Sequence, residues 1–76
     1  MAKFNGHKNW NHWNVSLWIN NDEGLYHKAY SLARRYKRDR AAQIMLDALL
    51  GAGIDRTPDG APYTYSSVRA AMVGIL

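Results

Sequence analysis

Residues 20–37 read NNDEGLYHKAYSLARRYK and hold the clearest helical pattern of the chain. The start of this stretch offers three capping side chains, Asn20, Asn21 and Asp22. Glu23 adds negative charge to the first turn, where the helix dipole favours it. Apolar side chains then recur at a spacing of about 3.6 residues, which predicts one buried stripe made of Leu25, Ala29, Leu32, Ala33 and Tyr36. The pattern predicts a helix from the cap to about Lys37.

The other side of this helix is basic. A helical wheel at about 100° per residue places the polar side chains there, namely His27, Lys28, Ser31, Arg34, Arg35, Lys37 and Arg38. Residues 34–40 carry five cations and one acid, so their sum of +4 equals the net charge of the whole chain. One interpretation is a solvated helix end, and the other is a surface for an anionic partner. The candidate binding residues here are Lys28, Arg34, Arg35, Lys37, Arg38 and Arg40.

A third helix follows a tight turn. We expect Asp39 to cap this helix, which then spans about Arg40 to Leu50. Gly51 and Gly53 are expected to end it. Its predicted buried side consists of Ala42, Met45, Leu46 and Leu49.

Residues 54–63 predict a loop, or at most a very small hairpin. Within it Pro58 fixes φ and Gly60 accepts a positive φ, which is typical of a turn. A last helix then runs toward the C-terminus, with a cap at Thr64, Ser66 or Ser67. Its inward side chains are Val68, Ala71, Met72 and Ile75, and we expect Leu76 to be packed.

The segment from Lys8 to Asn21 is rich in tryptophan and asparagine, and two patterns fit it. Strict alternation over residues 13–20 fits a strand, whereas a second set shares one helical face: Trp10, Trp13, Asn14, Leu17 and Trp18. We favour a helix, because a strand without a partner leaves its backbone groups unpaired. The tryptophans Trp10, Trp13 and Trp18 either fill the core or, where exposed, serve as an aromatic anchor for a partner.

Length and composition set the fold class. The 76 residues are expected to form a single domain, 1–76, that is all-α with three or four helices. No cysteine is present, which excludes disulfides and thiolate metal sites. The apolar runs are far shorter than the roughly 20 residues of a membrane span, and no secretory signal is recognisable. We therefore expect a cytoplasmic protein without membrane contact.

Catalytic and cofactor patterns are missing from the sequence. The three histidines, His7, His12 and His27, lack metal-ligand spacing, and the serines lack a nucleophile motif. The glycines at 51 and 53 follow a helix instead of preceding one, so they do not form a phosphate loop. The expectation is a binding protein, not an enzyme, with no metal and no cofactor.

Two family resemblances appear at this point. Residues 42–72 combine an apolar helix, the turn Thr57-Pro58-Asp59-Gly60, Tyr63 and a capped Ser67-Val68-Arg69 helix, and they resemble the helix–loop–helix segment in the DNA-binding regions of large serine recombinases. This resemblance implies helix-turn-helix-like packing and adds Arg69, on the last helix, to the binding residues.

Residues 9–26, NWNHWNVSLWINNDEGLY, together with residues 68–74, VRAAMVG, resemble a family of small proteins of tailed bacteriophages. This resemblance implies a protein that binds host machinery, such as a CRISPR effector, a restriction enzyme or RNA polymerase. The partner is then a host protein or protein–nucleic acid complex, which makes anti-CRISPR, other anti-defence or host takeover activity the first hypothesis. Direct binding of DNA or RNA as a regulator is the alternative. Pairing of residues 68–76 would give a homodimer.

Overall fold

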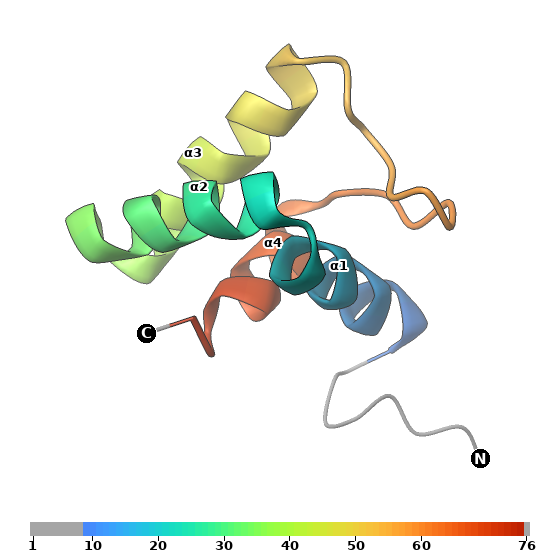
Figure 1. Cartoon of the computed structure of the whole chain (residues 1–76), viewed down its shortest axis with the longest axis horizontal. Coiled ribbons are helices and arrows are strands. Elements are labelled where there is room, and N and C mark those ends of the chain that lie inside the picture. Colours follow the sequence, from blue (N-terminus) through green and yellow to red (C-terminus); the bar gives the residue numbers. More distant parts are fainter. Residues whose placement is uncertain (1–8, 76) are drawn as a thin grey trace.

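Residues 9–75 are described by the computed structural model, and they form four helices joined by connections of unequal length (Figure 1). The helices are α1 (Trp10–Asn21), α2 (Glu23–Arg35), α3 (Arg38–Gly51) and α4 (Tyr65–Met72). The all-α fold class and the helical interpretation of the tryptophan-rich segment are confirmed. No helix within the described range is both long and apolar enough to cross a bilayer.

Local capping explains where α1 and α2 begin. The Asn9 side chain accepts a hydrogen bond from the His12 backbone N–H at 3.0 Å and starts α1. Asp22, in an extended conformation, ends α1 and caps α2 by accepting from the Leu25 N–H at 2.9 Å. Of the three caps that the sequence offered, the structure uses Asp22.

The prediction that Asp39 caps the third helix is wrong. Because the connector of Tyr36 and Lys37 is extended, α3 already begins at Arg38, and Lys37 stands at the capping position without a side-chain hydrogen bond. Asp39 therefore lies inside the first turn, with its carboxylate directed to α4. The predicted stop is confirmed, since α3 ends at Gly51 and Gly53 follows with a φ of 79°.

The connection between α3 and α4 is a long loop that folds back on itself. Its turn is the predicted one, since Gly60 has a φ of 94°, and a single antiparallel bridge joins Arg56 to Pro62. Thr64 then caps α4 in a reciprocal arrangement with Ser67. Leu76 lies outside the described residues.

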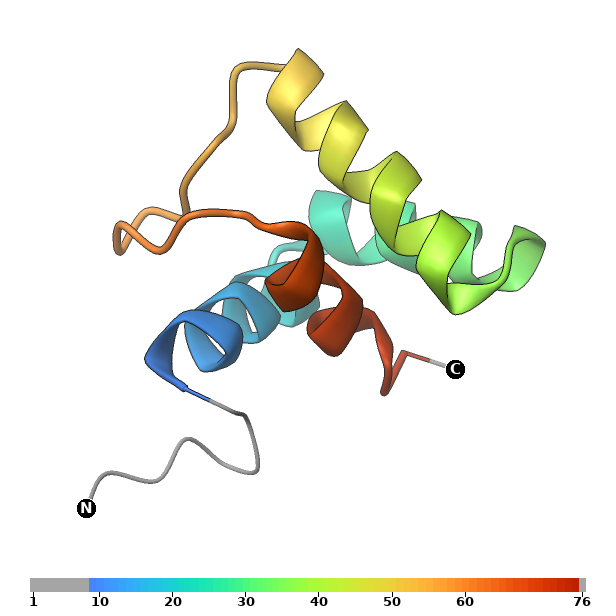
Figure 2. The ribbon, with the colours of Figure 1, turned by 180° about the vertical axis from the view of Figure 1, so that it is seen from behind.

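One hydrophobic cluster joins the four helices, and α4 packs against both α1 and α3 (Figure 2). All the inward positions predicted for α3 and α4 are buried, as are Ala29 and Leu32 of α2. Leu25 and Ala33 of the predicted stripe are partly buried against this cluster, and Tyr36 is exposed, with 42% of its surface open to solvent. It lies beyond the last turn of α2, where the chain is extended and the 3.6-residue period no longer applies.

Candidate functional site

Five cations gather at the closed end of the hairpin formed by α2 and α3, which we call the basic tip: Arg34, Arg35, Lys37, Arg38 and Arg40. All five side chains are exposed. The two-residue connector brings the last turn of α2 next to the first turn of α3, so the sequence run becomes one surface. Lys28 is also exposed and lies two turns before Arg35 on the same face of α2.

The one acid within the basic tip is neutralised by α4. The Arg69 guanidinium forms an ion pair with the Asp39 carboxylate. This hydrogen bond and the attraction of the two charges lower the pKa of Asp39 and raise the pKa of Arg69. Asp39 is thus held as a carboxylate whose charge is matched by Arg69, and within residues 9–75 none of the five tip cations forms an ion pair of its own. Arg69, predicted as a binding residue, ties α4 to α3.

The first turn of α3 adds to the positive potential of the tip. Its N-terminus lacks a side-chain cap, and Arg38 and Arg40 occupy the turn in which the helix dipole is positive. Cations at that position are unfavourable, by about 0.3–1 kcal/mol at an exposed site. Asp39 in the same turn offsets part of this effect, and an anionic group bound there would relieve the rest.

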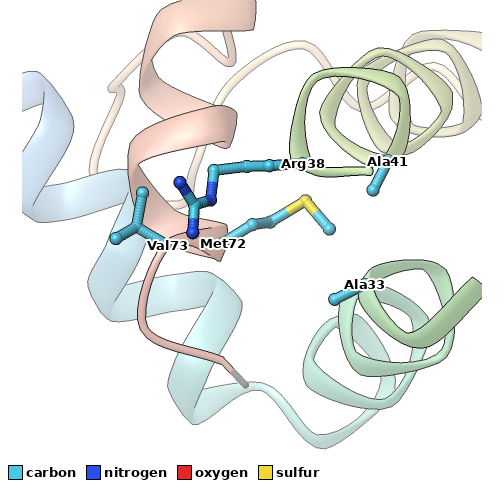
Figure 3. A pocket seen from close by; sticks show the side chains of 5 residues that line it. All are labelled: Ala33, Arg38, Ala41, Met72 and Val73. Carbon is cyan, nitrogen blue, oxygen red and sulfur yellow. The ribbon is translucent and has the colours of Figure 1, made fainter. Parts of the chain in front are cut away.

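Arg38 also overhangs a pocket of about 210 Å³ where α2, α3 and α4 meet. Figure 3 shows its guanidinium extended toward Met72 and Val73, opposite the small side chains Ala33 and Ala41. Ligand pockets for small molecules usually measure about 300–1,000 Å³. The space is suited to one side chain of a partner and is small for a cofactor.

Aromatic rings continue the basic tip along α2. The rings of Tyr26 and Tyr30 lie one turn apart, with centroids separated by 6.1 Å and planes inclined by 31°. The Arg34 guanidinium carbon lies 5.8 Å from the centroid of Tyr30. We call these three residues the Tyr–Arg row. A shallow cavity of about 340 Å³ lies beside it, lined by Tyr30, Ser31, Arg34 and Arg35.

The asparagine and tryptophan cluster of α1 has a structural role that the sequence did not reveal. The buried Asn14 side chain donates to the Asp59 carboxylate at 2.8 Å and accepts from the Thr57 hydroxyl at 2.6 Å. Trp18 donates its indole N–H to the same carboxylate at 2.9 Å, and the Asn11 amide donates to the Pro62 carbonyl. These contacts, which we call the loop clamp, fasten the 54–63 loop to α1.

The loop clamp engages one of the three predicted aromatic anchors, Trp18. Trp18 is half-buried and committed to Asp59, and Trp13 is partly buried. Trp10 is the most exposed of the three, at 41%, but it lies at the start of α1. Trp18 therefore serves the fold, Trp10 stays exposed, and the exposed aromatic surface that contacts a tip cation comes from Tyr30.

Replacing Asp59 with asparagine should change how stability depends on pH. The hydrogen bonds from Asn14 and Trp18 lower the pKa of Asp59 in the folded protein. Its stabilising contribution is therefore complete above the unfolded value of about 3.9 and is lost as the pH falls through the lower folded value. We expect the melting temperature of the native protein to exceed that of Asp59→Asn at pH 7 and the difference to shrink below about pH 4.

Thermal melts of the two proteins at several pH values from 7 to 2 test this. Asp39 titrates in both proteins, so its contribution cancels in the difference. A difference that stays constant over the whole range would show that the Asp59 charge does not support the clamp.

The described residues 9–75 contain no group of three or more histidine, aspartate or glutamate side chains arranged to hold a metal ion. His7 lies outside that range. No curated protein and no solved structure matches the chain significantly. A family model does match it, over residues 1–75, and is described as a family of unknown function, DUF7249. The chain, with its basic tip and loop clamp, belongs to that family.

Proposed function

We propose that this protein is a non-enzymatic binding protein that docks through its basic tip on a nucleic-acid-handling machine of a bacterial host and modulates it. The observation that carries the proposal is the charge balance of the tip. Five exposed cations occupy seven consecutive residues, and the single acid among them is paired with Arg69. Such a surface attracts an anionic partner over long range and speeds its association, with a strength that falls as salt is added.

The proposed setting is the cytoplasm of a phage-infected bacterium. The resemblance of residues 9–26 and 68–74 to phage proteins supports it, and the activity would be anti-CRISPR, other anti-defence or host takeover. The residues proposed to contact the partner are Lys28, Arg34, Arg35, Lys37, Arg38 and Arg40, with one partner side chain in the pocket beneath Arg38.

A second candidate is direct binding of nucleic acid, and the Tyr–Arg row favours it because aromatic rings beside cations suit bases and phosphates. Recognition of a groove of duplex DNA by α4 has less support. This helix packs on both α1 and α3, and its Arg69 is engaged by Asp39.

The packing of α4 also bears on the proposed homodimer. It uses Val68, Ala71, Met72 and Ile75 in the core of the monomer, so a homodimer would have to use other residues, such as the half-exposed Val73.

Affinity capture from a bacterial lysate, with and without nuclease, tests the proposal. We expect the tagged protein to retain a stoichiometric partner complex, and a version in which the tip arginines are replaced should lose it. Retention after nuclease treatment supports docking on protein, whereas loss after nuclease treatment supports the second candidate. Failure to retain any stoichiometric partner in either arm, or equal retention by the tip variant, would contradict docking through the tip.

A further inference from the structure

We infer that the Tyr–Arg row is a stacking site for an unpaired nucleobase, and that the basic tip holds the phosphates on either side of that base. This inference rests on the proposed function, because it assigns a chemistry to the anionic partner of the tip. The partner would be a single strand of DNA or RNA, either free or exposed on the host machine.

The first observation behind the stacking site is that Tyr30 is accessible. Tyr30 is 37% exposed although its ring is large and apolar, and the cavity beside it is also lined by Arg34 and Arg35. Tyr26 packs partly against the core and supports Tyr30 from the preceding turn, at a centroid separation of 6.1 Å. The ring is thus held on a helix and partly open to solvent, with Arg34 as the side chain that would have to move for a flat ligand to stack on it.

The second observation is that the Arg34 guanidinium makes few interactions with the rest of the protein. Its guanidinium carbon lies 5.8 Å from the Tyr30 centroid, close to the outer limit of about 6 Å for a cation–π contact. Within residues 9–75 it makes no hydrogen bond and no ion pair. Arg34 can therefore turn to a phosphate, or stack its plane on the incoming base, at the cost of the contact with Tyr30 but without breaking a hydrogen bond or ion pair.

The combination of an exposed tyrosine ring with the cations of the basic tip favours a single nucleic-acid strand over other anionic partners. In a duplex the faces of the bases are stacked on one another, so the Tyr30 ring has nothing to contact. Carboxylates on an acidic protein gain from the cations but not from the ring face. An unpaired base with its phosphates uses both, and base–aromatic stacking tolerates any sequence because every base has a π face.

Fluorescence anisotropy with a labelled 12-nucleotide oligo-dT tests the inference. We expect Tyr30→Ala to weaken binding by about tenfold to a hundredfold, the usual loss for one stacked base, and Tyr30→Phe to bind almost as well as the native protein. The slope of affinity against salt should be the same for Tyr30→Ala and the native protein, because no charge is removed. A 12-base-pair duplex should bind both equally.

Leu17→Ala is the matched control, since Leu17 is a large apolar side chain with the same exposure, 37%, but lies on α1 outside the row. It should change the affinity for oligo-dT less than twofold. Equal binding of oligo-dT by Tyr30→Ala and the native protein would overturn the stacking site, as would competition by polyglutamate that is as strong as competition by unlabelled oligo-dT. The proposed function is tested separately, by the lysate capture with the tip variant, so failure of the stacking site and failure of docking through the tip are distinguishable.

Discussion

Replacing Asn14 with alanine is expected to lower the free energy of unfolding by about 2–3 kcal/mol, because a buried polar network loses its centre. Asn14 is only 1% exposed, and its amide holds both the Thr57 hydroxyl and the Asp59 carboxylate. Thr57 is itself buried and would be left with only its acceptor role toward the Ala61 N–H. Unsatisfied buried groups keep their full cost of removal from water, so the loss exceeds that of one ordinary hydrogen bond.

Thermal and urea denaturation followed by circular dichroism measure this effect. For a domain of this size, 1 kcal/mol corresponds to about 4–8 °C, so the melting temperature should fall by about 10–20 °C. Asn20→Ala is the matched control, because Asn20 is exposed on the same helix and bonds only to Ser16. It should cost less than about 0.5 kcal/mol. Equal losses in the two variants would mean that the clamp does not hold the loop.

The triple replacement Arg34→Ala, Arg35→Ala, Arg38→Ala is expected to reduce affinity for a single strand by about a hundredfold at 0.1 M salt. Each phosphate contact to a single strand contributes about 0.7 to the log–log salt slope, so three lost contacts amount to about two orders of magnitude at that concentration. The fold should survive, since all three side chains are exposed and Arg38 opposes the dipole of α3.

Arg56→Ala provides the control for loss of a cation elsewhere. Arg56 lies in the 54–63 loop, away from the tip, and donates to the Gly60 carbonyl. Its replacement should change affinity by less than about twofold, because the loop lies at the other end of the molecule from the tip and salt screens exposed charges that are far apart. A comparable loss in Arg56→Ala would indicate that overall charge, and not the tip, governs binding.

The features that local sequence determines were predictable. Caps, apolar periods and glycine stops gave the helix boundaries to within a few residues, as Asp22, Gly53 and Thr64 show. The buried side of α3 followed from the same periodicity. The location of the cations at one end of the molecule also followed, because a short connector keeps neighbouring residues together.

The features that depend on contacts between distant residues were not predictable. The clamp joins Asn14 to residues 43 and 45 positions away, and Asp39 meets Arg69 across 30 positions. No local period encodes such pairs. Two sequence signals point to these pairs in retrospect. One is the excess of asparagines near the start of the chain, and the other is an acid within a basic run, which has a structural role when a distant arginine can reach it.

The basic tip is proposed to hold an anionic strand, and the salt dependence of oligo-dT binding is the sharpest test of that proposal. Anisotropy titrations between about 50 and 300 mM NaCl, roughly a sixfold range of salt concentration, give the slope for the native protein and for the triple variant. Five phosphate contacts predict a slope of about −3.5 for the native protein, and the two contacts that remain predict about −1.4 for the variant. Equal slopes for the two proteins, or native binding that does not respond to salt, would contradict the claim.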